Sequence, residues 1–172
     1  IVGCYASVLG GPWGSTHHAL EDVGVMRTIP GMTIVVPADA DQVRQVARAA
    51  VEFEGPMYIR LESDMPLNRG ETDFKVGRAI VLREGADITL MAYGAMVGRS
   101  LAAAQVLSER GVEARVVNMH TVKPIDTQAI LDAARATRGI ATVEEHSIIG
   151  GLGSAVAEFV AEEPTNITIK RI

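Results

Sequence analysis

Short β-branched hydrophobic runs alternate along the chain with longer stretches in which apolar residues recur at helical spacing. Before residue 62, the runs at residues 1–6, 32–36 and 57–61 predict buried strands. A helical pattern at about residues 17–28 ends where Pro30 and Gly31 cannot continue it. A second helix is predicted to begin at Asp39, because Gln42 stands at the spacing of a capping box, and to extend to about Phe53.

The pattern after residue 73 is more regular. Strands are predicted at residues 88–92, 114–118, 140–143 and 167–169, and helices at residues 97–110, 126–139 and 152–162. The first of these helices ends at Gly111, where a glycine cap is expected. Residues 76–83 predict an outer, antiparallel strand. Strands that alternate with helices in this way predict a mostly parallel sheet covered on both faces.

A polar, turn-rich stretch at residues 62–73 separates the two patterns and predicts a linker. We therefore expect an α/β protein of two three-layer α/β/α blocks with mostly parallel sheets, at residues 1–70, which include the linker, and 71–172. The chain opens on Ile1, inside a predicted strand and without a starting Met. We expect it to continue upstream as part of a longer polypeptide.

Charge and composition exclude several classes of protein. The formal net charge is -5, and the Lys and Arg residues are scattered among acids, so nucleic acid is not an expected partner. No apolar run approaches the roughly 20 residues that span a bilayer, so no membrane contact is expected. The single cysteine, Cys4, excludes an internal disulfide and predicts a buried thiol in a cytoplasmic protein.

Several long motifs resemble the transketolase family. Residues 14–22, 26–32 and 36–39 resemble the second half of its pyrimidine-binding domain, and residues 118–126 and 144–153 resemble its C-terminal domain. The similarity covers nearly the whole chain, with the motifs in the family's order. It implies that the first block is an incomplete pyrimidine-binding domain and that the second is a transketolase C-terminal-like domain.

The resemblance also implies a chemistry. Transketolases transfer a two-carbon ketol unit between a ketose and an aldose, on thiamine diphosphate held with Mg²⁺. In the family an N-terminal domain or subunit holds the diphosphate and Mg²⁺, and the upstream half of the pyrimidine domain supplies further cofactor contacts. We therefore expect an N-terminal partner subunit or section, a homo- or hetero-oligomer, and neither cofactor affinity nor turnover from this sequence by itself.

His17 is the candidate catalytic residue, since it matches the family histidine that faces the reacting carbons and the cofactor. At the start of the predicted helix, the backbone dipole would favour a neutral imidazole. Glu21 lies four residues after His17 and could orient it, and Asp22 lies four residues after His18. From the residues alone, a solvated helix start is the alternative. The resemblance favours the catalytic interpretation for His17 but not for His18.

Three candidate substrate-binding residues depart from the family pattern. Tyr5 stands where transketolases carry a histidine, Trp13 replaces an aspartate that binds a sugar hydroxyl, and Glu62 replaces an arginine that grips phosphate. A carboxylate cannot hold a phosphate dianion, so we expect an unusual ketol donor or acceptor that is unphosphorylated, cationic or more apolar. Arg60 could compensate for the lost arginine or could form a structural ion pair.

The glycine-rich residues 150–154 could form an anion nest or allow close packing of a helix on the sheet, and the sequence favours packing. His120 and His146 are expected to make interface or local hydrogen bonds. Three alternatives remain open: a deoxyxylulose-phosphate synthase, a 2-oxoacid dehydrogenase β subunit, and a non-catalytic assembly module. The second is disfavoured by Thr16 and Lys123, where its motifs carry other residues.

Overall fold

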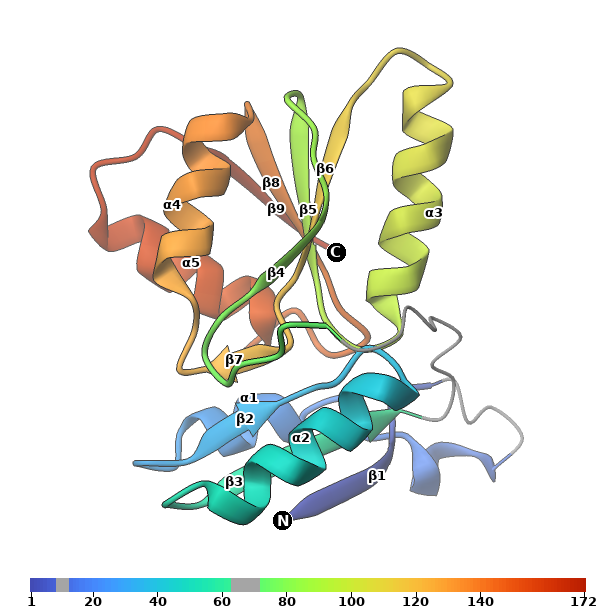
Figure 1. Ribbon diagram of the computed structural model, residues 1–172, viewed down its shortest axis with the longest axis vertical. Coiled ribbons are helices and arrows are strands. Elements are labelled where there is room, and N and C mark those ends of the chain that lie inside the picture. Colours follow the sequence, from blue (N-terminus) through green and yellow to red (C-terminus); the bar gives the residue numbers. More distant parts are fainter. Residues whose placement is uncertain (9–12, 63–71) are drawn as a thin grey trace.

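The computed structural model describes residues 1–8, 13–62 and 72–172, and their strands form two sheets (Figure 1). The first sheet has the order β1-β3-β2-β7. Its strands are β1 (Val2–Ala6), β3 (Met57–Glu62), β2 (Thr33–Val35) and β7 (Thr121–Lys123). The first three are parallel, whereas β7 comes from the later part of the chain and pairs antiparallel with β2.

The second sheet has the order β4-β6-β5-β8-β9. Its strands are β4 (Ile80–Arg83), β6 (Ala114–Asn118), β5 (Ile88–Ala92), β8 (Gly139–Val143) and β9 (Thr168–Arg171). All pair in parallel except β4, the predicted antiparallel edge strand. Figure 1 shows α3 (Met96–Ser108) on one side of this sheet, with α4 (Thr127–Ala136) and α5 (Leu152–Glu162) on the other. The predicted α/β architecture is confirmed.

Helix α2 (Ala40–Glu52) begins as its capping sequence predicts. The Asp39 side chain accepts a hydrogen bond from the backbone N–H of Gln42 at 2.8 Å. The Gln42 side chain reaches back to the backbone N–H of Ala38 (2.9 Å), one residue earlier than in a reciprocal capping box. After α3, Gly111 has a φ of 78°, the left-handed conformation expected of a glycine that ends a helix.

A large hydrophobic cluster includes residues of both blocks. Val23, Ile34 and Tyr58 from the first part belong to the same buried cluster as Met91 and Leu152 from the second. Because burial of apolar surface is the main stabilising contribution to folding, this common cluster stabilises both blocks together. The shared core and strand β7 join the two predicted blocks into one packed unit.

Two expectations for the first block are wrong. The predicted helix at residues 17–28 is replaced by a 3₁₀ turn, η2 (Ser15–His17), and a short helix, α1 (Asp22–Arg27). Between them, Ala19 forms a bridge with Ala6, and this tertiary pairing overrides the helical pattern. Cys4 is exposed rather than buried, because β1 lies at the edge of its sheet.

The remaining expectations concern the linker and the membrane. Most of the predicted linker, residues 63–71, lies outside the described residues, and Glu62 at its start belongs to β3. In the described part of the chain, no helix combines the length and the apolar character needed to cross a bilayer.

Candidate functional site

His17 ends the η2 turn, in the segment of residues 13–20 that we call the His17 segment. Its Nδ1 atom lies 3.0 Å from the Thr16 hydroxyl. Because α1 does not begin until Asp22, His17 is not at a helix N-terminus, and the predicted dipole effect on its charge has no basis. The Glu21 carboxylate accepts from the backbone N–H of Leu20 (3.3 Å), so its predicted orienting role finds no support in this geometry.

Three predicted site residues, Tyr5, Trp13 and His17, form one ring cluster, which we call the aromatic cluster. The ring centroids lie 6.1 Å apart for Tyr5 and Trp13, 5.6 Å for Tyr5 and His17, and 5.7 Å for Trp13 and His17. Tyr5 and Trp13 are 50% and 60% exposed. The aromatic cluster therefore offers substantial apolar ring surface to a ligand or a partner.

The backbone that presents Tyr5 is strained. Tyr5 has a φ of 59° and Ser7 a φ of 80°, both in the left-handed region that residues with a side chain seldom occupy. Each such residue costs about 1 kcal/mol or more. Strain of this kind recurs at functional sites, and here it turns the end of β1 so that the Tyr5 ring meets His17.

A mainly apolar hollow of about 510 Å³ opens beside the aromatic cluster. It is lined by Cys4, Tyr5, Ala40, Val43, Arg44, Leu61 and Glu62. A smaller hollow of about 170 Å³ shares Cys4 and Tyr5 and includes His17. Both lie where β1 and β3 end, and the carboxyl ends of parallel strands are where open α/β sheets bind ligands.

Arg60 and Glu62 belong to a buried network beneath this surface. The Arg60 side chain is 0% exposed, pairs with Asp22 at 3.0 Å and also contacts the Glu62 carboxylate. The structure thus contains the ion pair foreseen as the alternative role of Arg60, and the buried guanidinium is not presented to a phosphate at the surface. Burial raises the pKa of Glu62, against the opposing effects of Arg60 and the Ala95 N–H.

The glycine-rich residues 150–154 pack closely around an internal carboxylate. Glu144 accepts hydrogen bonds from the backbone N–H groups of Leu152 and Gly153, both at 2.8 Å, at the start of α5. A Cβ atom on Gly151 would lie 1.9 Å from the same carboxylate. A Cβ atom on Gly153 would lie 2.7 Å from the Thr142 hydroxyl oxygen on β8, so the start of α5 packs closely on the sheet, as expected. The N-terminus of α5 also holds the Glu144 carboxylate of its own chain.

The two histidines of the second block, His120 and His146, make local contacts, as expected. His146 accepts from the Gly24 N–H at Nε2 (3.3 Å), and its Nδ1 lies 2.6 Å from the Ser147 carbonyl oxygen, so both ring nitrogens contact the backbone. His120 is buried against the Phe74 ring, with centroids 4.4 Å apart. Burial lowers the pKa of His120 to about 4.

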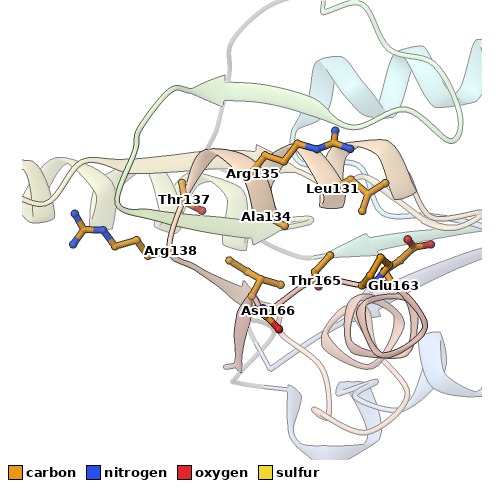
Figure 2. Close-up of a pocket in the computed structure, with 10 residues that line it drawn as sticks. Leu131, Ala134, Arg135, Thr137, Arg138, Glu163, Thr165 and Asn166 are labelled. Atoms are coloured by element: carbon orange, nitrogen blue, oxygen red, sulfur yellow. The ribbon is translucent and has the colours of Figure 1, made fainter.

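Another hollow, of about 500 Å³, lies at the amino ends of β8 and β9 in the second sheet (Figure 2). Figure 2 shows the guanidinium groups of Arg135 and Arg138 pointing apart. Each has its own carboxylate partner, Asp132 at 3.2 Å and Asp87 at 3.9 Å. The two arginines do not converge on one anion, so the aromatic cluster remains the stronger candidate site.

Across residues 1–8, 13–62 and 72–172, no three His, Cys, Asp or Glu side chains are grouped so as to hold a metal ion. The exposed rings of the aromatic cluster and the His17 imidazole fit an organic ligand better.

Sequence reasoning missed Glu145. Its side chain accepts from the Val8 N–H at 3.2 Å, and its carbonyl oxygen accepts from Arg60 at 2.9 Å. The available signal was a pair of acids, Glu144 and Glu145, directly after a predicted buried strand, where a solvated pair is the usual expectation.

Comparison with known proteins yields two family matches. Residues 1–65 match the family model described as transketolase, pyrimidine binding domain, and residues 77–172 match transketolase, C-terminal domain. A solved structure titled split gene transketolase, inactive beta4 tetramer, superposes with a TM-score of 0.88 at 42% identity, covering 99% of this chain and 55% of that chain.

Relatives in bacteria carry transketolase and synthase names. An apulose-4-phosphate transketolase subunit of Phocaeicola vulgatus is 41% identical over 98% of this chain and 55% of its own length. A 6-deoxy-6-sulfo-D-fructose transketolase subunit of Clostridium sp. is 44% identical over 87% of this chain and 47% of its own. The 1-deoxy-D-xylulose-5-phosphate synthase of Heliobacterium modesticaldum is 39% identical over 92% of this chain and 25% of its own.

The chain spans about half the length of the transketolase subunits that it matches. Its two domain matches follow each other in the family's order and together take in nearly every residue. With a parallel α/β fold and a histidine in an exposed ring cluster at the carboxyl edge of the first sheet, the chain belongs to the transketolase family.

Proposed function

We propose that this chain supplies the His17 side of an active site that transfers a two-carbon ketol unit between a ketose and an aldose. The observation that carries the proposal is the aromatic cluster, in which the His17 ring packs against both Tyr5 and Trp13. An N-terminal transketolase subunit or section would hold most of the thiamine diphosphate and its Mg²⁺. The mainly apolar hollow beside Tyr5 suits an organic ring system rather than a diphosphate.

When bound, thiamine diphosphate would supply the electron sink for cleavage of the carbon–carbon bond. The role of His17 would be to exchange hydrogen bonds and protons with an oxygen of the sugar. Because the Thr16 hydroxyl lies at Nδ1, the exchange with the sugar would take place at Nε2. Tyr5 and Trp13 would restrict the motion of the imidazole and exclude water from one side of it.

The same surface argues for a non-standard substrate. Trp13 and Tyr5 present aromatic rings where a phosphate would need cationic donors, and the guanidinium of Arg60 is buried and paired. We propose a ketol donor or acceptor that lacks a phosphate at this subsite. The two transketolase subunits compared above are named for different sugars, one a phosphate ester and the other a sulfo sugar, so the sugars named for these relatives differ.

The test compares substrates in the assembled enzyme. The full chain with its N-terminal partner, thiamine diphosphate and Mg²⁺ would be assayed with D-xylulose 5-phosphate and with free D-xylulose as donors. We expect kcat/KM to favour the free ketose, and Trp13→Phe, which keeps an aromatic ring, to retain this preference. A strong preference of the unaltered enzyme for the phosphate ester would refute the substrate proposal.

Synthase activity is the second candidate, supported by the 39% identity to a 1-deoxy-D-xylulose-5-phosphate synthase. That reaction releases carbon dioxide from pyruvate, so pyruvate-dependent carbon dioxide release from the assembled enzyme would favour it over ketol transfer. The role of a non-catalytic assembly module predicts neither activity.

A binding measurement tests whether the N-terminal partner is needed to hold the cofactor. We propose that the enzyme is a cytoplasmic homo- or hetero-oligomer and that residues 1–172 by themselves have no cofactor affinity. Calorimetry with thiamine diphosphate and Mg²⁺ should show no binding to these residues alone and clear binding to the assembly. Micromolar binding to the isolated residues would contradict the proposal.

A further inference from the structure

The loop after β8, residues 144–150, holds the His17 segment from the side of the second sheet. We call these residues the β8–α5 loop. The Glu145 carboxylate accepts from the backbone N–H of Val8 at 3.2 Å, and the Ser147 N–H donates to the Leu20 carbonyl oxygen at 2.8 Å. Val8 precedes the His17 segment in the sequence, and Leu20 ends it. The same loop therefore contacts the chain on both flanks of His17.

Arg60 makes further hydrogen bonds that join the His17 segment to the β8–α5 loop. Its guanidinium donates from one terminal nitrogen to the Ala19 carbonyl oxygen at 3.1 Å and to the Glu145 carbonyl oxygen at 2.9 Å. From Nε it donates to Asp22, the first residue of α1, at 3.0 Å. One side chain thus links the end of the His17 segment, the start of the next helix and the β8–α5 loop.

The network continues into the second sheet through Glu62. The Glu62 carboxylate contacts Arg60 and accepts from the backbone N–H of Ala95 at 2.6 Å. A Cβ atom on Gly94 would lie 2.3 Å from this carboxylate, so backbone and carboxylate are in close contact there. The Arg60 guanidinium also lies 5.7 Å from the centre of the Tyr93 ring. The residues directly after β5, Tyr93 to Ala95, therefore contact the side chains of both Arg60 and Glu62.

We propose that Arg60 and Glu145 are positioning residues, through which the second block fixes the location of the His17 segment; the proposal rests on the function proposed above for His17. A planar guanidinium bonded on several edges fixes the relative positions of all its partners, which a lysine with one ammonium group cannot do. Small displacements of a catalytic group lower turnover strongly, so a scaffold of this kind acts on kcat.

Two substitutions test the two links separately. Glu145→Ala removes the Val8 contact while the carbonyl contact with Arg60 stays, and Glu145→Gln keeps an acceptor for Val8. Arg60→Lys keeps the charge but loses the fork. Glu158→Ala is the matched control, because the Arg27–Glu158 pair (2.5 Å) also joins the two blocks but lies at the far end of α1 from His17.

The first measurement is amide hydrogen exchange at residues 13–20 in the full chain with its partner subunit. We expect exchange to rise roughly tenfold in Glu145→Ala and more in Arg60→Lys, and to stay unchanged in Glu145→Gln and Glu158→Ala. The second is steady-state kinetics of ketol transfer, where we expect kcat to fall about tenfold in Glu145→Ala with KM nearly unchanged.

Unchanged exchange and kcat in folded Glu145→Ala would overturn the proposal, as would equal effects in Glu158→Ala. If Arg60→Lys fails to fold, the comparison of Glu145→Ala with Glu145→Gln still decides the outcome. If the unaltered assembly transfers no ketol unit, the proposed function fails, whereas the exchange data still show whether these residues hold the His17 segment.

Discussion

His120 should make the stability of this protein sensitive to mild acid. The imidazole is fully buried, contacts the Thr121 hydroxyl at 3.0 Å and stacks on Phe74. Burial lowers its pKa from 6.5 to about 4, since the apolar surroundings disfavour the charged ring more than the Arg78 backbone and Asp126 favour it. The folded state therefore holds the neutral form, whereas the unfolded chain takes up a proton near pH 6.5.

The size and sign of the effect follow from this difference. The folded pKa is the lower of the two, so the contribution is fully present above pH 6.5 and is lost as the pH falls from 6.5 to about 4. Over that window, the free energy of unfolding should decrease by on the order of 3 kcal/mol from His120 alone.

Urea unfolding followed by circular dichroism at pH 4.5, 5.5, 6.5 and 7.5 measures this contribution, with His120→Gln as the test variant. We expect His120→Gln to be less stable at pH 7.5 but to lose less stability on acidification than the unaltered protein. Thr121→Val is the control, because it removes the hydroxyl contact and keeps the imidazole, so its pH dependence should match that of the unaltered protein.

The comparison uses differences between pH profiles, since carboxylates also titrate in the lower part of the window. Parallel profiles for His120→Gln and the unaltered protein would refute the reasoning, because they would mean that His120 has the same pKa in both states.

Three further substitutions test the packing around α2 and α5. Asp39→Ala removes the cap of α2 and should cost about 1–2 kcal/mol of unfolding free energy in urea titration; no change would contradict the cap. Glu144→Gln leaves one of two buried N–H groups facing an amide NH₂ and should cost about 2–3 kcal/mol, seen as a lower Tm, and an unchanged Tm would count against it. Gly151→Ala places a methyl group against the Glu144 carboxylate and should cost about 1–3 kcal/mol, whereas Gly139→Ala, with its nearest atom at 3.5 Å, should cost far less; equal costs would disprove the packing argument.

The second sheet was predictable because its signals are local. Strands β5 and β6 have the predicted bounds, since both are short apolar runs between turns and central strands of a parallel sheet. Helix α5 likewise has its predicted bounds, fixed by the glycines before it. The earlier block was less predictable: the pairing of Ala19 with Ala6 replaces a helical turn, and no local pattern announces it.

The candidate site was also predictable from the sequence only in part. Tyr5, Trp13 and His17 were singled out from the sequence and lie together in the structure, although the helix expected at His17 is absent from residues 18–21. The burial of Arg60 could not be foreseen, because its partners Asp22 and Glu145 come from segments on either side of it, 38 and 85 residues away. Strand β7 is only three residues long and pairs with a strand far earlier in the chain.

That short strand limits where such a polypeptide can be divided. A break between the two regions that match the family's domains, residues 1–65 and 77–172, would leave β7 on one fragment and its partner β2 on the other. Each product would carry an open sheet edge and half of a shared apolar core, and such surfaces favour aggregation. Chimaeras that exchange the later region between relatives must therefore preserve the complementarity of β7 and β2 if they are to fold.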